Sequence, residues 1–202
     1  LQDGASCTQA GLLLSSSGKD PKISFQKGCD LKDPSACFSL GLIASKENKG
    51  EEARSLWKTA CDLGMATACA VLGDVYENGA TGVQDIGLAQ QFFQQGCSLG
   101  EPISCTRLGL LLPPAEGLSW LEKGCSQQEA SGCYNAGSLY LTGEGIPADP
   151  TKAAPLFEQA CTLGNPEGCL ALAELYRKGI GVKRSKAKYK ALIKQACVEG
   201  AT

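Results

Sequence analysis

Ten of the twelve cysteines in this chain form five pairs, and seven residues separate the two members of every pair. The pairs are Cys29/Cys37, Cys61/Cys69, Cys97/Cys105, Cys125/Cys133 and Cys161/Cys169. A spacing that recurs along a chain of 202 residues indicates a structural repeat. Because each repeat buries its apolar side chains mainly against its neighbours, the chain is expected to form a stack of local cores.

The residues after the second cysteine of each pair have the apolar spacing of an α-helix. Apolar side chains stand 0, 3, 6 and 7 positions from this cysteine, as Cys69, Leu72 and Val75 illustrate. Glycine or alanine at position +4, such as Gly73, lets a neighbouring helix approach closely. In the longer copies a glycine is expected to end this first helix. These glycines are Gly79, Gly143 and Gly179.

A second helix is expected to run up to the first cysteine of the next pair. Large apolar side chains stand four and five residues before that cysteine, as in Leu56-Trp57. Leu163-Gly164 illustrates the end of this helix, and Asn165-Pro166 the start of the next one. The residues between paired cysteines are therefore expected to form a tight turn between two helices.

The longer copies, residues 69–97 and 133–161, resemble the Sel-one-like repeat (SLR), a relative of the tetratricopeptide repeat. They follow its Leu-Gly, Tyr, Gly-x-Gly-Val, Asp, Lys-Ala and Ala-Cys-x-x-Gly columns closely. The cysteine pairing is similar to that of the disulfide-rich Helicobacter cysteine-rich proteins. Copies that start at Cys7, Cys37 and Cys105 lack the Gly-x-Gly-Val loop, and Leu112-Pro113-Pro114 predicts one shortened first helix.

This resemblance implies an all-α fold, an α/α superhelical solenoid of about six disulfide-stapled helix-turn-helix repeats. It also implies a single repeat domain over residues 1–202. The repeats are expected at approximately 7–36, 37–68, 69–104, 105–132, 133–168 and 169–202.

The cysteines are expected to form structural disulfides, because the Cys-x-x-Cys spacing of zinc and redox sites is absent. Two connectivities remain open. Local pairing leaves Cys7 and Cys197 unpaired or paired outside the chain, whereas pairing across each repeat, from Cys7–Cys29 to Cys169–Cys197, uses all twelve. The invariant gap within pairs favours local pairing, and the family resemblance implies the same.

Composition restricts the chemistry and the location of the chain. Regularly spaced cysteines indicate an oxidising compartment, so we expect a secreted or periplasmic protein, with the mitochondrial intermembrane space as the alternative. A net charge of −2 gives no general attraction to nucleic acid, and no apolar run is long enough to span a membrane. Histidine is absent, which excludes Ser-His and Cys-His catalysis. We expect no cofactor and no metal.

The family resemblance places the first helix of each repeat on a concave face. Positions +2, +5 and +9 from the cysteine lie opposite the core stripe and vary between copies, which is expected of a groove for an irregular peptide. We therefore predict a non-catalytic, monomeric scaffold that binds a protein or peptide ligand. A solvated face without a ligand is the alternative. The candidate residues are Asp74, Asn78, Arg107, Asn135, Ser138, Glu174 and Lys178.

A weak β-lactam-binding or β-lactamase-like enzyme is the alternative function, because the resemblance to the cysteine-rich family implies it. Ser-x-x-Lys occurs three times, starting at Ser16, Ser55 and Ser185. The Ser-Asp-Asn and Lys-Thr-Gly elements that accompany this motif in such enzymes are absent from the chain. We therefore expect no catalysis.

Residues 183–194 hold six basic residues and no acidic one. Such residues suit the solvent-facing side of a terminal helix, particularly toward its C-terminal end. The alternative is that they dock an acidic partner or an anionic surface. The six are Lys183, Arg184, Lys186, Lys188, Lys190 and Lys194.

Overall fold

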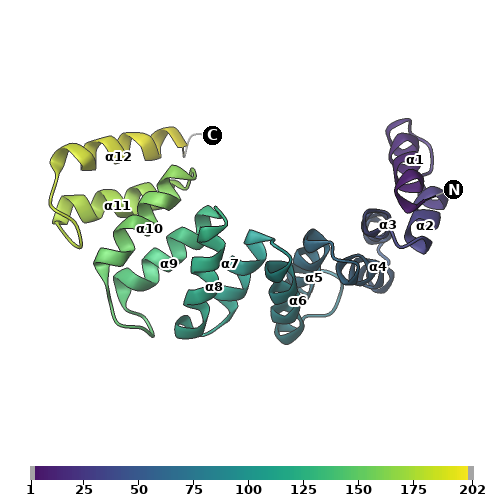
Figure 1. The fold of residues 1–202 in the computed structure, drawn as a ribbon, viewed down its shortest axis with the longest axis horizontal. Coiled ribbons are helices and arrows are strands. Elements are labelled where there is room, and N and C mark those ends of the chain that lie inside the picture. The colour runs from purple at the N-terminus through teal and green to yellow at the C-terminus, as the bar shows by residue number, and fades with distance from the viewer. Residues whose placement is uncertain (1–2, 200–202) are drawn as a thin grey trace. The chain divides into compact units, whose positions relative to one another are not determined.

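The computed structural model describes residues 3–199, and that range contains twelve α-helices and no strand (Figure 1). The predicted all-α repeat fold is confirmed. The helices are α1 (Gly4–Ser16), α2 (Lys22–Asp30), α3 (Pro34–Lys46), α4 (Gly50–Asp62), α5 (Ala66–Asn78), α6 (Ile86–Ser98), α7 (Pro102–Leu111), α8 (Pro114–Ser126), α9 (Ala130–Thr142), α10 (Pro150–Thr162), α11 (Pro166–Lys178) and α12 (Lys186–Glu199).

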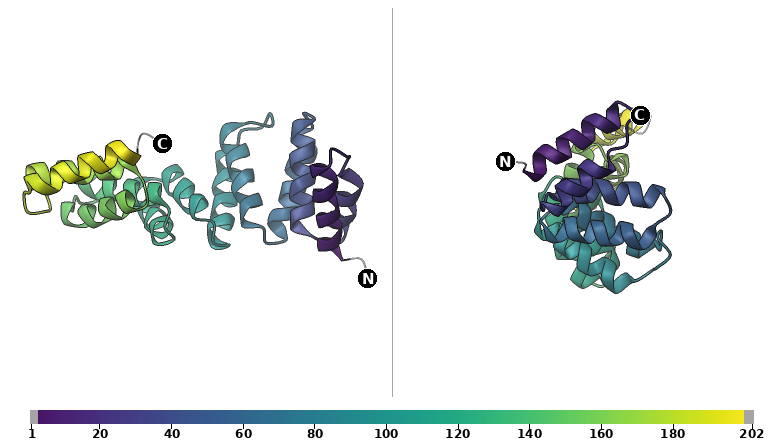
Figure 2. Two further views of the ribbon diagram at one scale, coloured as in Figure 1. Left: turned by 90° about the horizontal axis from the view of Figure 1, so that it is seen from above. Right: turned by 90° about the vertical axis from the view of Figure 1, so that its right-hand side faces the viewer.

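The helices form two compact units, one through Glu101 with α1–α6 and one from Pro102 with α7–α12. Within each unit every helix packs against the next one in the chain, and odd-numbered neighbours such as α7 and α9 also touch. Figure 2 shows this succession of hairpins from two further directions. The odd-numbered helices are the predicted first helices of the repeats. The single domain and its repeat boundaries stay predictions.

Helix ends lie where the sequence places turn-forming residues. Asp33 accepts a hydrogen bond from the Ser35 backbone N–H at the start of α3, and Asn165 caps α11 in the same way. Gly79 ends α5 with a φ of 67°, in the left-handed region that favours glycine. Helix α7 has ten residues, whereas the other odd-numbered helices have thirteen. The Pro-Pro pair after Leu112 accounts for this shortening.

The described cysteines pair locally, across the turn between consecutive hairpins. The Cα atoms of the bonded cysteines are 4.4 to 4.9 Å apart. Each disulfide joins the end of an even-numbered helix to the start of the next odd-numbered one. The bonds are Cys29–Cys37, Cys61–Cys69, Cys125–Cys133 and Cys161–Cys169.

Pairing across a repeat is therefore not the arrangement of these eight cysteines. Cys97 belongs to the first unit and Cys105 to the second, and their pairing stays a prediction. Cys7 and Cys197 carry free thiols, the first buried and the second exposed. Their partners outside the chain also stay a prediction.

Glycine at position +4 of the odd-numbered helices accepts a large side chain from the next helix. A Cβ on Gly41 would lie 2.4 Å from Trp57 Nε1, and a Cβ on Gly137 would lie 2.9 Å from Phe157 Cε1. Because the glycine has no side chain, the two helices of a hairpin can pack close together. This contact orients each odd-numbered helix so that positions +2, +5 and +9 point away from the local core.

Candidate functional site

The seven predicted site residues lie on four odd-numbered helices, and none of them is buried. Asp74, Asn78 and Lys178 are exposed. Arg107, Asn135, Ser138 and Glu174 are half-buried. Asp74 and Asn78 belong to the first unit, and the other five belong to the second.

Two of these residues, Asn135 and Ser138, meet around one groove in the second unit. The groove has a volume of about 250 Å³ and lies among α7, α8 and α9. Its lining includes Leu110 at position +5 of α7, Pro114 at the start of α8, and Thr142 at position +9 of α9. The columns that the sequence analysis selected on separate helices are therefore brought together here.

Hydrogen bonds along α9 determine the polarity of this groove. Asn135 Nδ2 donates to the Ser131 carbonyl at 2.8 Å, and Ser138 Oγ donates to the Tyr134 carbonyl at 2.9 Å. Thr142 Oγ1 donates to the Ser138 carbonyl at 3.0 Å. Because the hydroxyl hydrogens are used in this way, the hydroxyl oxygens mainly offer acceptor lone pairs to the groove.

The remaining walls of this groove are apolar or acidic. Leu110, Leu112 and Leu121 contribute aliphatic surface, and Glu144 adds a carboxylate at the rim. Leu110 is 51% exposed, although it is a large aliphatic side chain. The groove therefore suits a ligand that combines an apolar side chain with hydrogen-bond donors.

A second groove, of about 490 Å³, lies among α1, α2 and α3 in the first unit. Its lining includes Leu12 at position +5 of α1, and Ser39, Leu42 and Lys46 at positions +2, +5 and +9 of α3. The sequence analysis missed these four residues. Counting the same columns from Cys7 and Cys37 would have found them.

The rim of the first-unit groove is charged and includes Asp20, Lys22, Lys46 and Glu47. Lys22 at the start of α2 forms an ion pair with Glu47, which directly follows α3. Hydrogen bonds from Lys22 and Lys49 lower the pKa of the Glu47 carboxyl. The two grooves thus share an exposed leucine at position +5 but differ in their polar rims.

Three of the predicted residues of α5 and α11, Asn78, Glu174 and Lys178, form contacts within their own helices. Asn78 Nδ2 donates to the Asp74 carbonyl at 3.0 Å. Glu174 forms ion pairs with Arg177 and with Lys178, the latter at 2.8 Å. Hydrogen bonds from Arg177 and then Lys178 lower the pKa of the Glu174 carboxyl from 4.5 to about 2. Glu174 and Lys178 therefore form one charged cluster rather than two independent contacts.

The three Ser-x-x-Lys sequences lack the geometry of a nucleophile and its base. In the part of the chain that the structure describes, no lysine side-chain amine is hydrogen-bonded to the serine of its motif. Ser185 Oγ instead accepts a hydrogen bond from the Lys188 backbone N–H at 3.3 Å, as a cap of α12. Ser16 Oγ donates to the Leu13 carbonyl, Lys58 Nζ bonds Asp62, and Lys188 Nζ donates to the Tyr176 hydroxyl. A reactive serine would need a nearby base to accept its proton.

Residues 3–199 contain no group of three or more Cys, Asp or Glu side chains that could hold a metal ion. Over the same residues, no helix combines the length and the apolar composition required to cross a bilayer.

The chain matches known proteins over most of its length. The Sel1 repeat matches residues 34–65, 66–101, 130–165 and 166–193. Cytochrome c oxidase assembly factor 7 of Xenopus tropicalis is 30% identical over 142 residues, which cover 65% of this chain and 49% of that protein. The chain thus spans about half the length of the curated relatives it matches.

Two solved structures extend this comparison. A Sel1 repeat protein from Oxalobacter formigenes matches with a TM-score of 0.77 and 20% identity, covering 99% of this chain and 84% of that one. Cysteine-rich protein B of Helicobacter pylori matches with 28% identity and a TM-score of 0.48, covering 55% of this chain and 86% of that one. Since the matched repeats cover more than half of the sequence, the chain belongs to the Sel1 repeat family.

Proposed function

We propose that this chain is a non-catalytic scaffold that binds a protein or peptide segment on the face formed by its odd-numbered helices. One observation carries the proposal. Position +5 of α1 and positions +2, +5 and +9 of α3 line one groove, and position +5 of α7 and positions +2, +5 and +9 of α9 line another. Each groove includes an exposed leucine at position +5, beside polar side chains.

The disulfides support this function energetically. Each described bond holds the end of one hairpin against the start of the next. A groove whose walls are already ordered loses less conformational entropy when a ligand binds. The proposed location is secreted or periplasmic, because such bonds persist in an oxidising compartment.

The similarity to cytochrome c oxidase assembly factor 7 supports a second candidate partner. If the shared repeats serve a shared purpose, the bound segment belongs to a protein that is being assembled into cytochrome c oxidase. That role would place the chain in the mitochondrial intermembrane space.

A peptide-display selection against the immobilised oxidised chain tests the scaffold function. Selected peptides would be synthesised, and their dissociation constants measured by calorimetry. We expect Leu110→Lys or Leu42→Lys to weaken binding about tenfold or more, because a lysine replaces the apolar contact of the groove wall. Asn135→Ala and Glu174→Ala test the predicted residues of α9 and α11.

Leu170→Lys is the matched control. Leu170 is 47% exposed and lies on α11 at position +1, outside the groove columns. This variant should retain full binding. If the selected peptides bound the wild type, Leu42→Lys and Leu110→Lys with equal affinity, binding in these grooves would be refuted.

Incubation with a fluorescent penicillin tests the enzymatic alternative. The proposal expects no covalent adduct after denaturation. An adduct that maps to Ser16, Ser55 or Ser185 and disappears in the corresponding alanine variant would overturn the non-catalytic assignment.

A further inference from the structure

The basic residues near α12 form a surface whose charge the fold does not neutralise. We propose that this surface docks an acidic polypeptide segment, independently of the two grooves. The basic surface comprises Lys183, Arg184, Lys186, Lys190 and Lys194, all of which are exposed.

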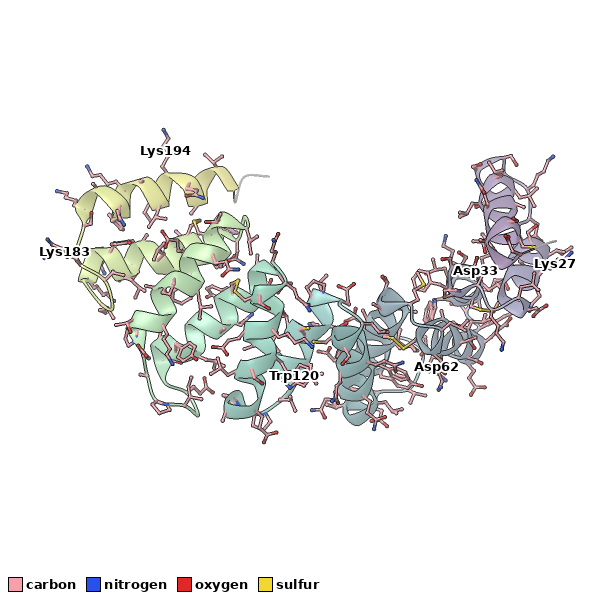
Figure 3. All side chains as sticks on the ribbon, in the orientation of Figure 1. Lys27, Asp33, Asp62, Trp120, Lys183 and Lys194 are labelled. Carbon is pink, nitrogen blue, oxygen red and sulfur yellow. A yellow bond between two sulfur atoms is a disulfide. The ribbon has the colours of Figure 1, made fainter. Side chains whose placement is uncertain are left out.

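The basic surface is continuous from the first residue of α12, Lys186, to Lys194. Lys186, Lys190 and Lys194 are spaced four residues apart, so they lie on one face of the helix. At 1.5 Å per residue this row extends about 12 Å. Lys183 and Arg184 continue it into the loop before the helix. Figure 3 shows Lys194 pointing away from α11, with Lys183 beyond the opposite end of α12.

These cations have no acidic partner among the residues that the structure describes. Within residues 3–199, no ion pair joins any of the five residues to an Asp or Glu side chain. Elsewhere lysines are paired, as Lys58 is with Asp62 and Lys178 with Glu174. The positive potential of the surface is therefore available to a ligand.

The stability of α12 does not explain why the basic residues gather at its start. The sequence analysis associated the cluster with a helix C-terminus, but α12 begins at Lys186, so most of the cations lie at its N-terminal end. That end of the helix dipole is positive and disfavours cations. Like charges four residues apart on a helix also repel each other. A neutral polar face would keep this side of α12 hydrated without these costs.

A hollow beside the surface favours a polypeptide over a flat lipid bilayer. It has a volume of about 520 Å³ and combines Lys183 and Arg184 with the apolar Val182 and the Tyr176 ring. Lys188 Nζ lies 4.6 Å from the centre of that ring and donates to the Tyr176 hydroxyl at 2.8 Å. The hollow can receive one side chain while neighbouring carboxylates contact the lysine row.

Fluorescence anisotropy of a labelled short peptide of repeated Glu-Leu-Glu-Ser tests the proposal against the oxidised full chain. We expect binding that weakens as NaCl is raised and that is lost for the same peptide with Gln in place of Glu. The triple variant Lys186→Gln, Lys190→Gln, Lys194→Gln should raise the dissociation constant about tenfold.

The triple variant Lys19→Gln, Lys32→Gln, Lys58→Gln changes the net charge equally and should bind the peptide like the wild type. Circular dichroism verifies that both variants are folded. If both variants bound the peptide equally weakly, net charge alone would account for the effect, and docking at the basic surface would be contradicted. Binding to phosphatidylserine vesicles without binding to the peptide would also overturn it, because the ligand would then be a membrane.

Discussion

Gly73 on α5 lies so close to Phe93 on α6 that a Cβ on Gly73 would be 2.4 Å from Phe93 Cε1. Phe93 is fully buried, so its ring has no free space into which to move. The same relation joins Gly41 to Trp57 in the preceding hairpin. The small residue of each Leu-Gly step thus sets the distance between the two helices of a repeat.

Replacement of Gly73 by alanine should lower the free energy of unfolding by about 2 kcal/mol, because the Phe93 ring or the whole helix must move. Urea denaturation followed by circular dichroism measures the change. Gly87→Ala is the control, since Gly87 is exposed and a Cβ there would meet only Asp85 Oδ1 at 3.3 Å. This control should change the free energy of unfolding by less than about 1 kcal/mol, because Gly87 lies in the first turn of α6 and its Cβ would meet a single side-chain oxygen. Equal destabilisation by both substitutions would contradict the packing argument.

Loss of one disulfide should destabilise the chain measurably. The double variant Cys61→Ala, Cys69→Ala opens a short loop, and chain entropy predicts a loss of about 2.5 kcal/mol. The comparison uses urea denaturation of the oxidised proteins. Repeating it with reductant provides the control, because the entropic difference between wild type and variant should then largely disappear. An undiminished difference under reduction would mean that packing, not the bond, accounts for the loss.

The Glu174 carboxyl should titrate far below an ordinary glutamate. Arg177 and then Lys178 hold its pKa at about 2, against an ordinary value of 4.5. The stabilisation is therefore fully present above pH 4.5 and is lost as the pH falls through about 2. NMR titration of the side-chain carboxyl carbon measures this directly. Arg177→Gln should move the midpoint upward toward 4.5, and an unchanged midpoint would exclude Arg177 as the main cause.

Much of the fold follows from the local sequence. Asn165 starts a helix, Gly79 ends one, and Pro113 shortens α7, all as predicted. These features depend on backbone conformations and side-chain caps within a few residues, so they need no knowledge of distant contacts.

The candidate grooves were only partly predictable. Periodicity identifies which face of a helix is opposite the core, and on this basis Asn135 and Ser138 were predicted. Leu12 and Leu42 stand at position +5 and were missed because the columns were not counted from Cys7 and Cys37. Periodicity alone does not reveal which columns of two neighbouring helices meet around a groove. The position of the basic surface was likewise misjudged, because the start of α12 at Lys186 lacks the proline that marks several other helices.

Cleavage at Met65 tests the disulfide-stapled architecture most directly. Met65 is the single methionine of the chain and lies between Cys61 and Cys69. Cyanogen bromide in acid cuts there without disulfide exchange, and electrophoresis under denaturing conditions then separates fragments that no bond connects. Local pairing predicts that the two fragments stay joined until a reductant is added. Fragments that separate without reductant would contradict the account, since pairing across the repeats leaves no disulfide spanning Met65.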